Sequence, residues 1–142
     1  MDKLFLVIVM KEYIEELLDG LNMGILAIDH LVDKIESDKL RDIVLHQRKA
    51  YGDLKEKLEH LYTFKTDEVK NKLMLETMIE MKTIVTNDQK IAKMLSLGTH
   101  QAILKSSHIL NKSKDVDHSI KNHFKEFETI SQEYIEKLKV YL

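Results

Sequence analysis

Two stretches of the chain repeat one pattern: GLNMGILAIDHL at residues 20–31 and GTHQAILKSSHI at residues 98–109. In both, a Gly is followed by Ile-Leu at five and six residues and by a His at ten residues. A shift of 80 residues also aligns apolar positions that follow each stretch, since Leu40, Val44 and Leu54 fall on Ile120, Phe124 and Tyr134. The sequence therefore predicts two helical hairpins of similar pattern.

The predicted helices carry apolar residues at alternating spacings of four and three, which is typical of helices packed in a bundle. In the first helix, predicted over residues 2–36, these positions are Ile14, Leu18, Leu21, Ile25, Ile28, Val32 and Ile35. In the second, ending near residue 62, they are Leu40, Val44, Gln47, Tyr51, Leu54, Leu58 and Leu61. In the last helix they are Ile120, Phe124, Phe127, Ile130, Tyr134, Leu138 and Tyr141.

Short polar breaks mark where helices begin. Ser37 or Asp38 is a candidate N-cap for the second helix, TND at residues 86–88 precedes the fourth, and Asp115 precedes the last. The sequence predicts a single domain over residues 1–142, with hairpin 1 at about 2–63 and hairpin 2 at about 88–142. A crossover segment between them contains a short helix at about 66–85, with Met74, Met78 and Met81 on one face. The fold class is thus an all-α four-helix bundle with one long connection.

The composition supports this fold and excludes several functions. The 142 residues include no Pro, no Cys and only 4 Gly, which is unusual for proteins rich in strands and turns. The absence of Cys excludes disulfides and thiolate metal sites, and it fits a cytoplasmic protein. The net charge of −2 is well mixed along the chain, so no nucleic-acid partner is expected. No phosphate-binding loop or catalytic motif is present, so an enzyme is not expected.

With the stretch LLDGLNMGILAIDHL at residues 17–31, this arrangement resembles the bacterial ferritin-like, rubrerythrin-type domains of unknown function, and more distantly the spore coat F-type proteins. In the metal-binding relatives, helices one and three supply a Glu and helices two and four supply Glu-x-x-His, and together these hold two irons. The corresponding residues here are Leu21, Gln47, Ala50, Thr99, Phe127 and Ile130. None is a carboxylate or a His, and no carboxylate falls on the apolar stripe of the first helix. We therefore expect no metal and no cofactor.

The N-terminal sequence contains more apolar residues than one face of a helix can bury. The uninterrupted run includes Leu4, Phe5, Leu6, Val7, Val9 and Met10. It is too short to span a membrane, which takes about 20 residues. Surplus apolar surface of this kind usually marks an interaction site, so the sequence predicts a homodimer joined through these residues. A membrane surface is a less favoured partner.

Three functions follow from these observations. The first is a non-enzymatic bundle that acts through protein–protein contacts, as a structural or regulatory protein that the resemblance links to sporulation or stress. The second is an iron-binding ferritin-like oxidase or storage protein with a displaced metal site, which the sequence does not locate. Glu76 and Glu80 are four residues apart on the predicted crossover helix, a spacing that can hold a cation, although a solvated helix face is the favoured interpretation. The third is a protein that associates with membrane surfaces through its apolar N-terminus.

Overall fold

The computed structural model is all-helical over the residues it describes, which are 3–63, 80, 87–112 and 116–142. For residues 3 and 5–7 the description covers the backbone only. Four α-helices make up this part of the chain: α1 (Lys3–Leu31), α2 (Asp38–Tyr62), α4 (Asp88–Lys112) and α5 (His118–Leu138). Two 3-10 turns follow α1 and α5, at Val32–Lys34 and Lys139–Tyr141. The crossover helix predicted at 66–85, with its Met stripe and Glu76, lies outside the described residues, and only Glu80 within it is described.

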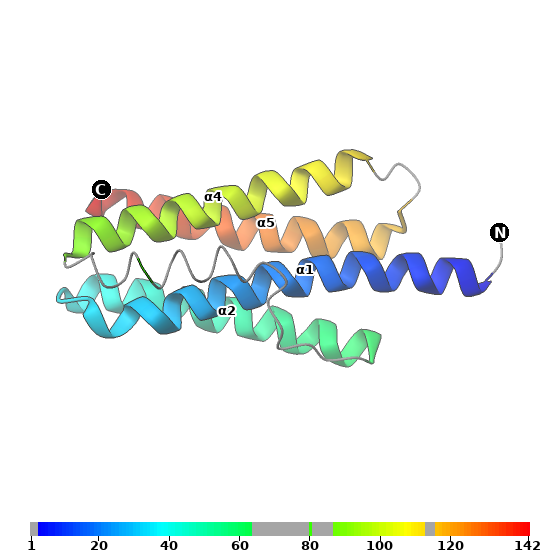
Figure 1. Ribbon diagram of the computed structural model, residues 1–142, viewed down its shortest axis with the longest axis horizontal. Helices are drawn as coiled ribbons and strands as arrows, with labels where there is room; N and C mark the ends of the chain where they lie inside the picture. The colour runs from blue at the N-terminus through cyan, green and yellow to red at the C-terminus, as the bar shows by residue number, and fades with distance from the viewer. Residues whose placement is uncertain (1–2, 64–79, 81–86, 113–115) are drawn as a thin grey trace.

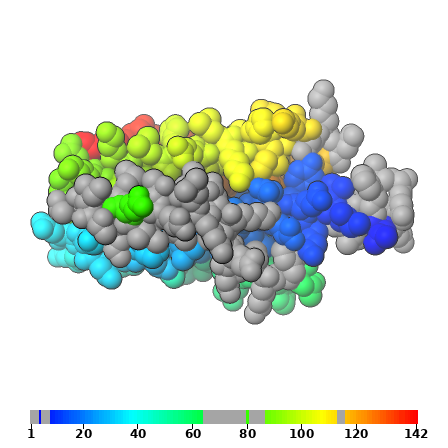
Figure 2. Space-filling view, in the orientation of Figure 1, coloured from blue at the N-terminus to red at the C-terminus, as the bar shows by residue number. Residues whose placement is uncertain are grey.

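The four helices form two antiparallel hairpins, α1 with α2 and α4 with α5, as the repeat predicts (Figure 1). The closest packing is within each hairpin, α2 also packs on α5, and α1 packs more sparsely on α4. The helices thus surround the core in the cyclic order α1, α2, α5, α4. Figure 2 shows the side of the bundle that faces the viewer in Figure 1, with α4 along one edge and the α1–α2 hairpin along the other.

The first hairpin turns earlier than the sequence predicts. The α-helix ends at Leu31 rather than near residue 36, and a 3-10 turn leads to Ile35, which is extended. Ser37 is the N-cap of α2, and its hydroxyl accepts a hydrogen bond from the Leu40 amide at 3.2 Å, which confirms one of the two predicted caps. The early stop gives the chain room to reverse and place α2 antiparallel to α1.

The N-cap predicted for the last helix is wrong. The last helix begins at His118 with Asp117 in the N-cap position, not near Asp115, which lies outside the described residues. At the start of α4, by contrast, the Asn87 side chain accepts a hydrogen bond from the Lys90 amide at 2.8 Å, as expected from the TND sequence.

The core consists of two apolar clusters, one toward each end of the bundle. The first includes Ile28, Leu40, Val44 and Ile91, and the second includes Leu18, Leu21, Phe124 and Phe127. The predicted apolar stripes are largely confirmed, with two corrections. Leu61 is 55% exposed, and Tyr141 is half-buried in the last 3-10 turn. Leu61 lies in the last turn of α2.

Candidate functional site

Polar side chains are buried in the middle of the bundle, near the junction of the two apolar clusters. Gln47 follows Val44 of the first cluster and precedes Tyr51 of the second along α2. Thr99 from α4 and Ser131 from α5 are also buried. We refer to Gln47, Tyr51, Thr99 and Ser131 as the polar layer. Gln47 and Thr99 are the only two of the six predicted ligand-equivalent residues that are polar, and the structure brings them together.

Gln47 is tied to α4 through its amide nitrogen. Its Nε2 donates to Thr99 Oγ1 at 3.2 Å, and the Thr99 hydroxyl in turn donates to the Leu95 carbonyl at 2.7 Å. The other amide atom, Oε1, is buried and has no hydrogen-bond partner in the described part of the chain. Buried polar atoms nearly always have a partner, so this acceptor is the unusual feature of the layer.

Tyr51 is a buried member of the second cluster. Its ring stacks on Phe127 with 5.4 Å between centroids, and its hydroxyl is 2.6 Å from Ser131 Oγ. Burial raises the pKa of the Tyr51 phenol, while hydrogen bonding by Ser131 and the polar groups of Gln47 and Thr99 act in the opposite direction. The phenol therefore stays protonated near neutral pH.

The four other ligand-equivalent residues do not form a polar site. Leu21 and Phe127 are buried within the second apolar cluster. Ala50 and Ile130 are half-buried and lie beside the buried stripe rather than on it. Ile130 packs half-buried against the second apolar cluster, and the fully buried position next to it is Ser131.

The sequence contained a signal for the Tyr51–Ser131 pair that the apolar pattern concealed. The two residues are 80 positions apart, which is the shift that aligns the second helices of the two hairpins. Because α2 and α5 run antiparallel, residues 80 positions apart meet only near the middle of the two helices (Figure 1). Leu40 and Ile120, which are also 80 positions apart, belong to different apolar clusters.

Asp19 corrects the expectation that the buried face of the first helix contains no carboxylate. Asp19 is only 5% exposed, and Asn22, one turn along, is 4% exposed. Neither lies on the predicted stripe, which assumed that α1 is covered from one direction. In the structure α1 contacts both α2 and α4, so its buried face is wider and includes polar side chains at its flank.

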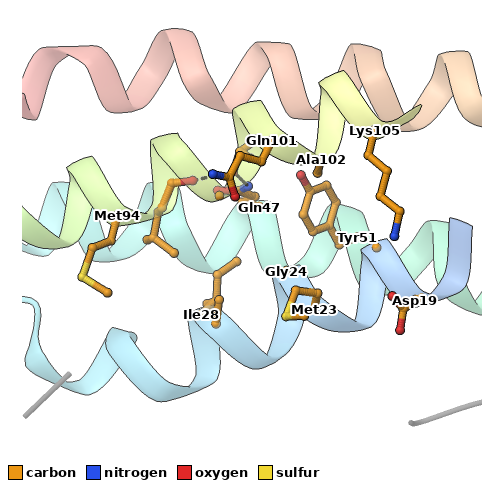
Figure 3. Close-up of a pocket in the computed structure, with 15 residues that line it drawn as sticks. Asp19, Met23, Gly24, Ile28, Gln47, Tyr51, Met94, Gln101, Ala102 and Lys105 are labelled. Atoms are coloured by element: carbon orange, nitrogen blue, oxygen red, sulfur yellow. Dashed lines mark hydrogen bonds between the residues drawn. The ribbon is translucent and has the colours of Figure 1, made fainter. Parts of the chain in front are cut away.

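A pocket of about 230 Å³ lies between α1 and α4, with α2 behind it (Figure 3). The helices leave this space because small residues face it, namely Gly20 and Ala27 from α1 and Gly98 and Ala102 from α4, whereas Gly24, which also lines it, is closely approached by the Tyr51 ring. Met23, Ile28 and Met94 provide apolar walls, and Gln47 and Tyr51 reach the pocket from α2. Asp19 and Lys105 lie at one end and Met94 at the other (Figure 3).

Other arrangements of functional groups have structural explanations. No group of three or more His, Asp or Glu side chains within the described ranges is placed to hold a metal ion. Ser106 and Ser107 both donate their hydroxyls to Glu128 Oε1, at 2.9 and 3.0 Å, which ties α4 to α5. These two hydrogen bonds to one carboxylate oxygen are structural contacts between the helices.

The structure leads to a test of the polar layer by the substitutions Gln47→Leu and Thr99→Val. We expect Gln47→Leu to raise the free energy of unfolding by about 1 kcal/mol, because it removes a buried acceptor without a partner. Thr99 keeps its bond to the Leu95 carbonyl in this variant. Thr99→Val should instead lower the free energy by about 1 kcal/mol, because it leaves the whole Gln47 amide unpaired.

Urea unfolding of the two single variants and the double variant measures this coupling. In the double variant the cost of Thr99→Val should largely disappear, because the amide that it strands is gone. If Gln47→Leu lowers the free energy of unfolding by more than about 1 kcal/mol, Oε1 has a partner and the description of the layer is wrong.

The apolar N-terminal residues lie at the far end of α1. The first turns of this helix extend beyond the ends of the other three (Figure 1). Leu4 is 64% exposed and Ile8 is 49% exposed, whereas Val9 and Met10 are half-buried and Met10 packs against the second apolar cluster. The side chains of Phe5, Leu6 and Val7 lie outside the described part of the chain. We refer to residues 3–9 as the N-terminal overhang.

Within the described residues, no helix combines the length and apolar character that crossing a membrane requires. Comparison of the chain with protein-family models, with curated proteins and with solved structures gives no match.

Proposed function

We propose that this protein is a non-catalytic, ferritin-like bacterial bundle that acts through protein–protein contacts, and that it associates as a homodimer through the N-terminal overhang. The observation that carries the proposal is the exposure of Leu4 and Ile8 on turns of α1 that extend past the rest of the bundle. Large apolar side chains exposed together on a projecting helix indicate an interaction surface.

The ferritin-like part of the proposal is supported by the packing order of the helices and by the long connection between the hairpins. The non-catalytic part is supported by the side chains at the ligand-equivalent positions. Leu21 and Phe127 are buried among apolar residues there, and Gln47 is bonded to Thr99. The lack of Cys supports a place in the cytoplasm, and the resemblance to spore coat F-type proteins supports a structural role.

A second copy of the chain is the occupant we assign to the overhang. An isologous dimer brings the same surface of each copy against the other, so both overhangs are covered by one contact. Seven helical residues extend only about 10 Å, so the interface is short compared with a standard one of about 800 Å² per partner. We therefore expect a weak dimer whose population depends on protein concentration.

The test introduces charge into the overhang with Leu4→Glu and Ile8→Glu together. In sedimentation velocity over a concentration series, the parent should shift from monomer to dimer, and the variant should stay a folded monomer at every concentration. The matched control is Leu97→Glu with Leu104→Glu on α4, because these leucines are similarly exposed, at 56% and 64%. The control should dimerise as the parent does.

Two other results would contradict the proposal. A parent that remains monomeric at the highest concentration would exclude the homodimer, and sedimentation with anionic vesicles would then show whether the overhang binds membrane surfaces instead. Equal loss of dimer in the control would place the interface on another face.

The non-catalytic part predicts that protein purified without an affinity tag from iron-rich medium contains well under one iron per chain. The reason is that di-iron sites need several anionic oxygen ligands, which the ligand-equivalent residues do not supply. Metal analysis by mass spectrometry, together with an assay of ferrous iron oxidation, checks this. Stoichiometric iron with oxidase activity would favour the alternative of an iron-binding protein.

A further inference from the structure

The pocket between α1 and α4 is large enough for an organic molecule. An engineered apolar cavity of about 150 Å³ binds benzene, and this pocket is about 230 Å³. On that scale it accommodates roughly ten non-hydrogen atoms. Its walls are mostly apolar, and two of them are methionines, Met23 and Met94, whose flexible side chains adjust to the shape of a ligand.

One residue that lines the pocket has a buried oxygen without a hydrogen-bond partner among the described residues. Gln47 lines it and is only 2% exposed, and its Oε1 has no partner among the described residues. Of the neighbouring hydroxyls, Thr99 donates its proton to the Leu95 carbonyl, and Tyr51 shares a hydrogen bond of 2.6 Å with Ser131 Oγ, in which either hydroxyl can be the donor. Gln47 Oε1 is therefore the acceptor in this pocket that lacks a donor among the described residues, and a ligand with a hydrogen-bond donor would supply one.

We propose that this pocket binds a small, mostly apolar molecule with one hydroxyl group, which donates its hydrogen bond to the Gln47 side-chain carbonyl. A simple phenol or a short alcohol belongs to this class. The small residues Gly20, Gly98 and Ala102 provide the space, and the methionines and Ile28 contact the hydrocarbon part.

Charged ligands fit the site less well. A carboxylate would place a second acceptor against Oε1, and a cation would have to give up its water among apolar walls. The charged residues at the end of the pocket do not offer a free counter-ion, since Lys105 is paired with Glu16 at 3.3 Å and Asp19 also has an interaction partner. A neutral hydroxyl donates the missing hydrogen bond to Gln47 Oε1 without repulsion between two acceptors and without desolvation of a charge.

The test compares two ligands of nearly equal shape, p-cresol and toluene, which differ by one hydroxyl. Isothermal titration of the full chain should show saturable binding of both, with p-cresol at least tenfold tighter. In Gln47→Leu the preference should reverse in favour of toluene, because the hydroxyl then enters an apolar pocket without a partner. Circular dichroism confirms that the variant is folded.

Two variants that fill the pocket complete the test. Ala102→Phe places a ring in the space, and Gly98→Leu adds a side chain where a Cβ meets no atom within 4 Å. Either variant, if folded, should lose binding of both ligands. Failure of the folded parent to bind either compound would overturn the proposal, as would an unchanged preference in Gln47→Leu or binding that persists in a filled variant. Dimerisation through the overhang is measured separately, so these outcomes leave that proposal untouched.

Discussion

Replacing Gly24 with Ala is expected to lower the free energy of unfolding by about 1–3 kcal/mol, although Ala is the better helix former by about 1 kcal/mol. A Cβ at this position would lie 2.6 Å from Cε2 and 2.8 Å from Cδ2 of the Tyr51 ring. Separations this short are repulsive, so either the ring or the α1 backbone must move. Overpacking of this kind typically costs about 1–3 kcal/mol.

The Tyr51 ring cannot move without further losses. It is 2% exposed, stacks on Phe127, and has its hydroxyl bonded to the fully buried Ser131. A shift that relieves the contact with the added methyl group would weaken the stacking and lengthen that hydrogen bond, which adds about 1 kcal/mol. Gly24 is thus required because α1 approaches the aromatic ring of α2 closely, and not because its backbone conformation is unusual.

Gly52 and Gly98 provide matched controls, since a Cβ at either position meets no atom within 4 Å. Changing either one to Ala should raise the free energy of unfolding by up to about 1 kcal/mol through helix propensity alone. Thermal and urea unfolding of the three variants measure the contrast. If Gly24→Ala is as stable as the controls, the close packing of Tyr51 on α1 is not present in solution.

Replacing Asp88 with Ala is expected to lower the free energy of unfolding by about 2–3 kcal/mol. The Asp88 carboxylate accepts hydrogen bonds from the backbone amides of Glu36 and Ser37, each at 2.8 Å. These amides belong to the turn before α2, so one side chain at the start of α4 holds the first hairpin against the second. Bonds to a charged acceptor are each worth about 1.5–3 kcal/mol, with partial exposure placing them at the lower end.

Asp53→Ala is the control for loss of an exposed carboxylate. Asp53 forms an ion pair with Lys49 within α2 at 2.8 Å and is well exposed, so its removal should change the free energy of unfolding by less than about 0.5 kcal/mol. Asn87→Ala separates the ordinary N-cap of α4 from this contact, because it should cost only about 1 kcal/mol. An Asp88→Ala variant no less stable than Asn87→Ala would show that the contact between hairpins contributes little.

The apolar spacing along the chain predicted most of the secondary structure and much of the core. Leu18, Leu21, Val44 and Phe124 are buried as the alternating pattern indicates, because each helix must present one continuous apolar stripe to its neighbours. Gln47 is the polar residue in the stripe predicted for the second helix, and the structure shows it bonded to Thr99. Local chemistry was also sufficient for the caps at Ser37 and Asn87, since a cap bonds only to its own helix.

The tertiary structure decided the features that depend on two helices at once. Asp19 is buried because α1 has two neighbours, and Tyr51 meets Ser131 because α2 and α5 pack together. The pocket exists because small residues of α1 and α4 face each other across a gap. A periodic pattern states which side of a helix is buried, but not how far that helix stands from the next one. The distance between two helices depends on the side chains of both at their point of contact. For this reason only the tertiary structure reveals the close packing of Tyr51 on Gly24 and the pocket between α1 and α4.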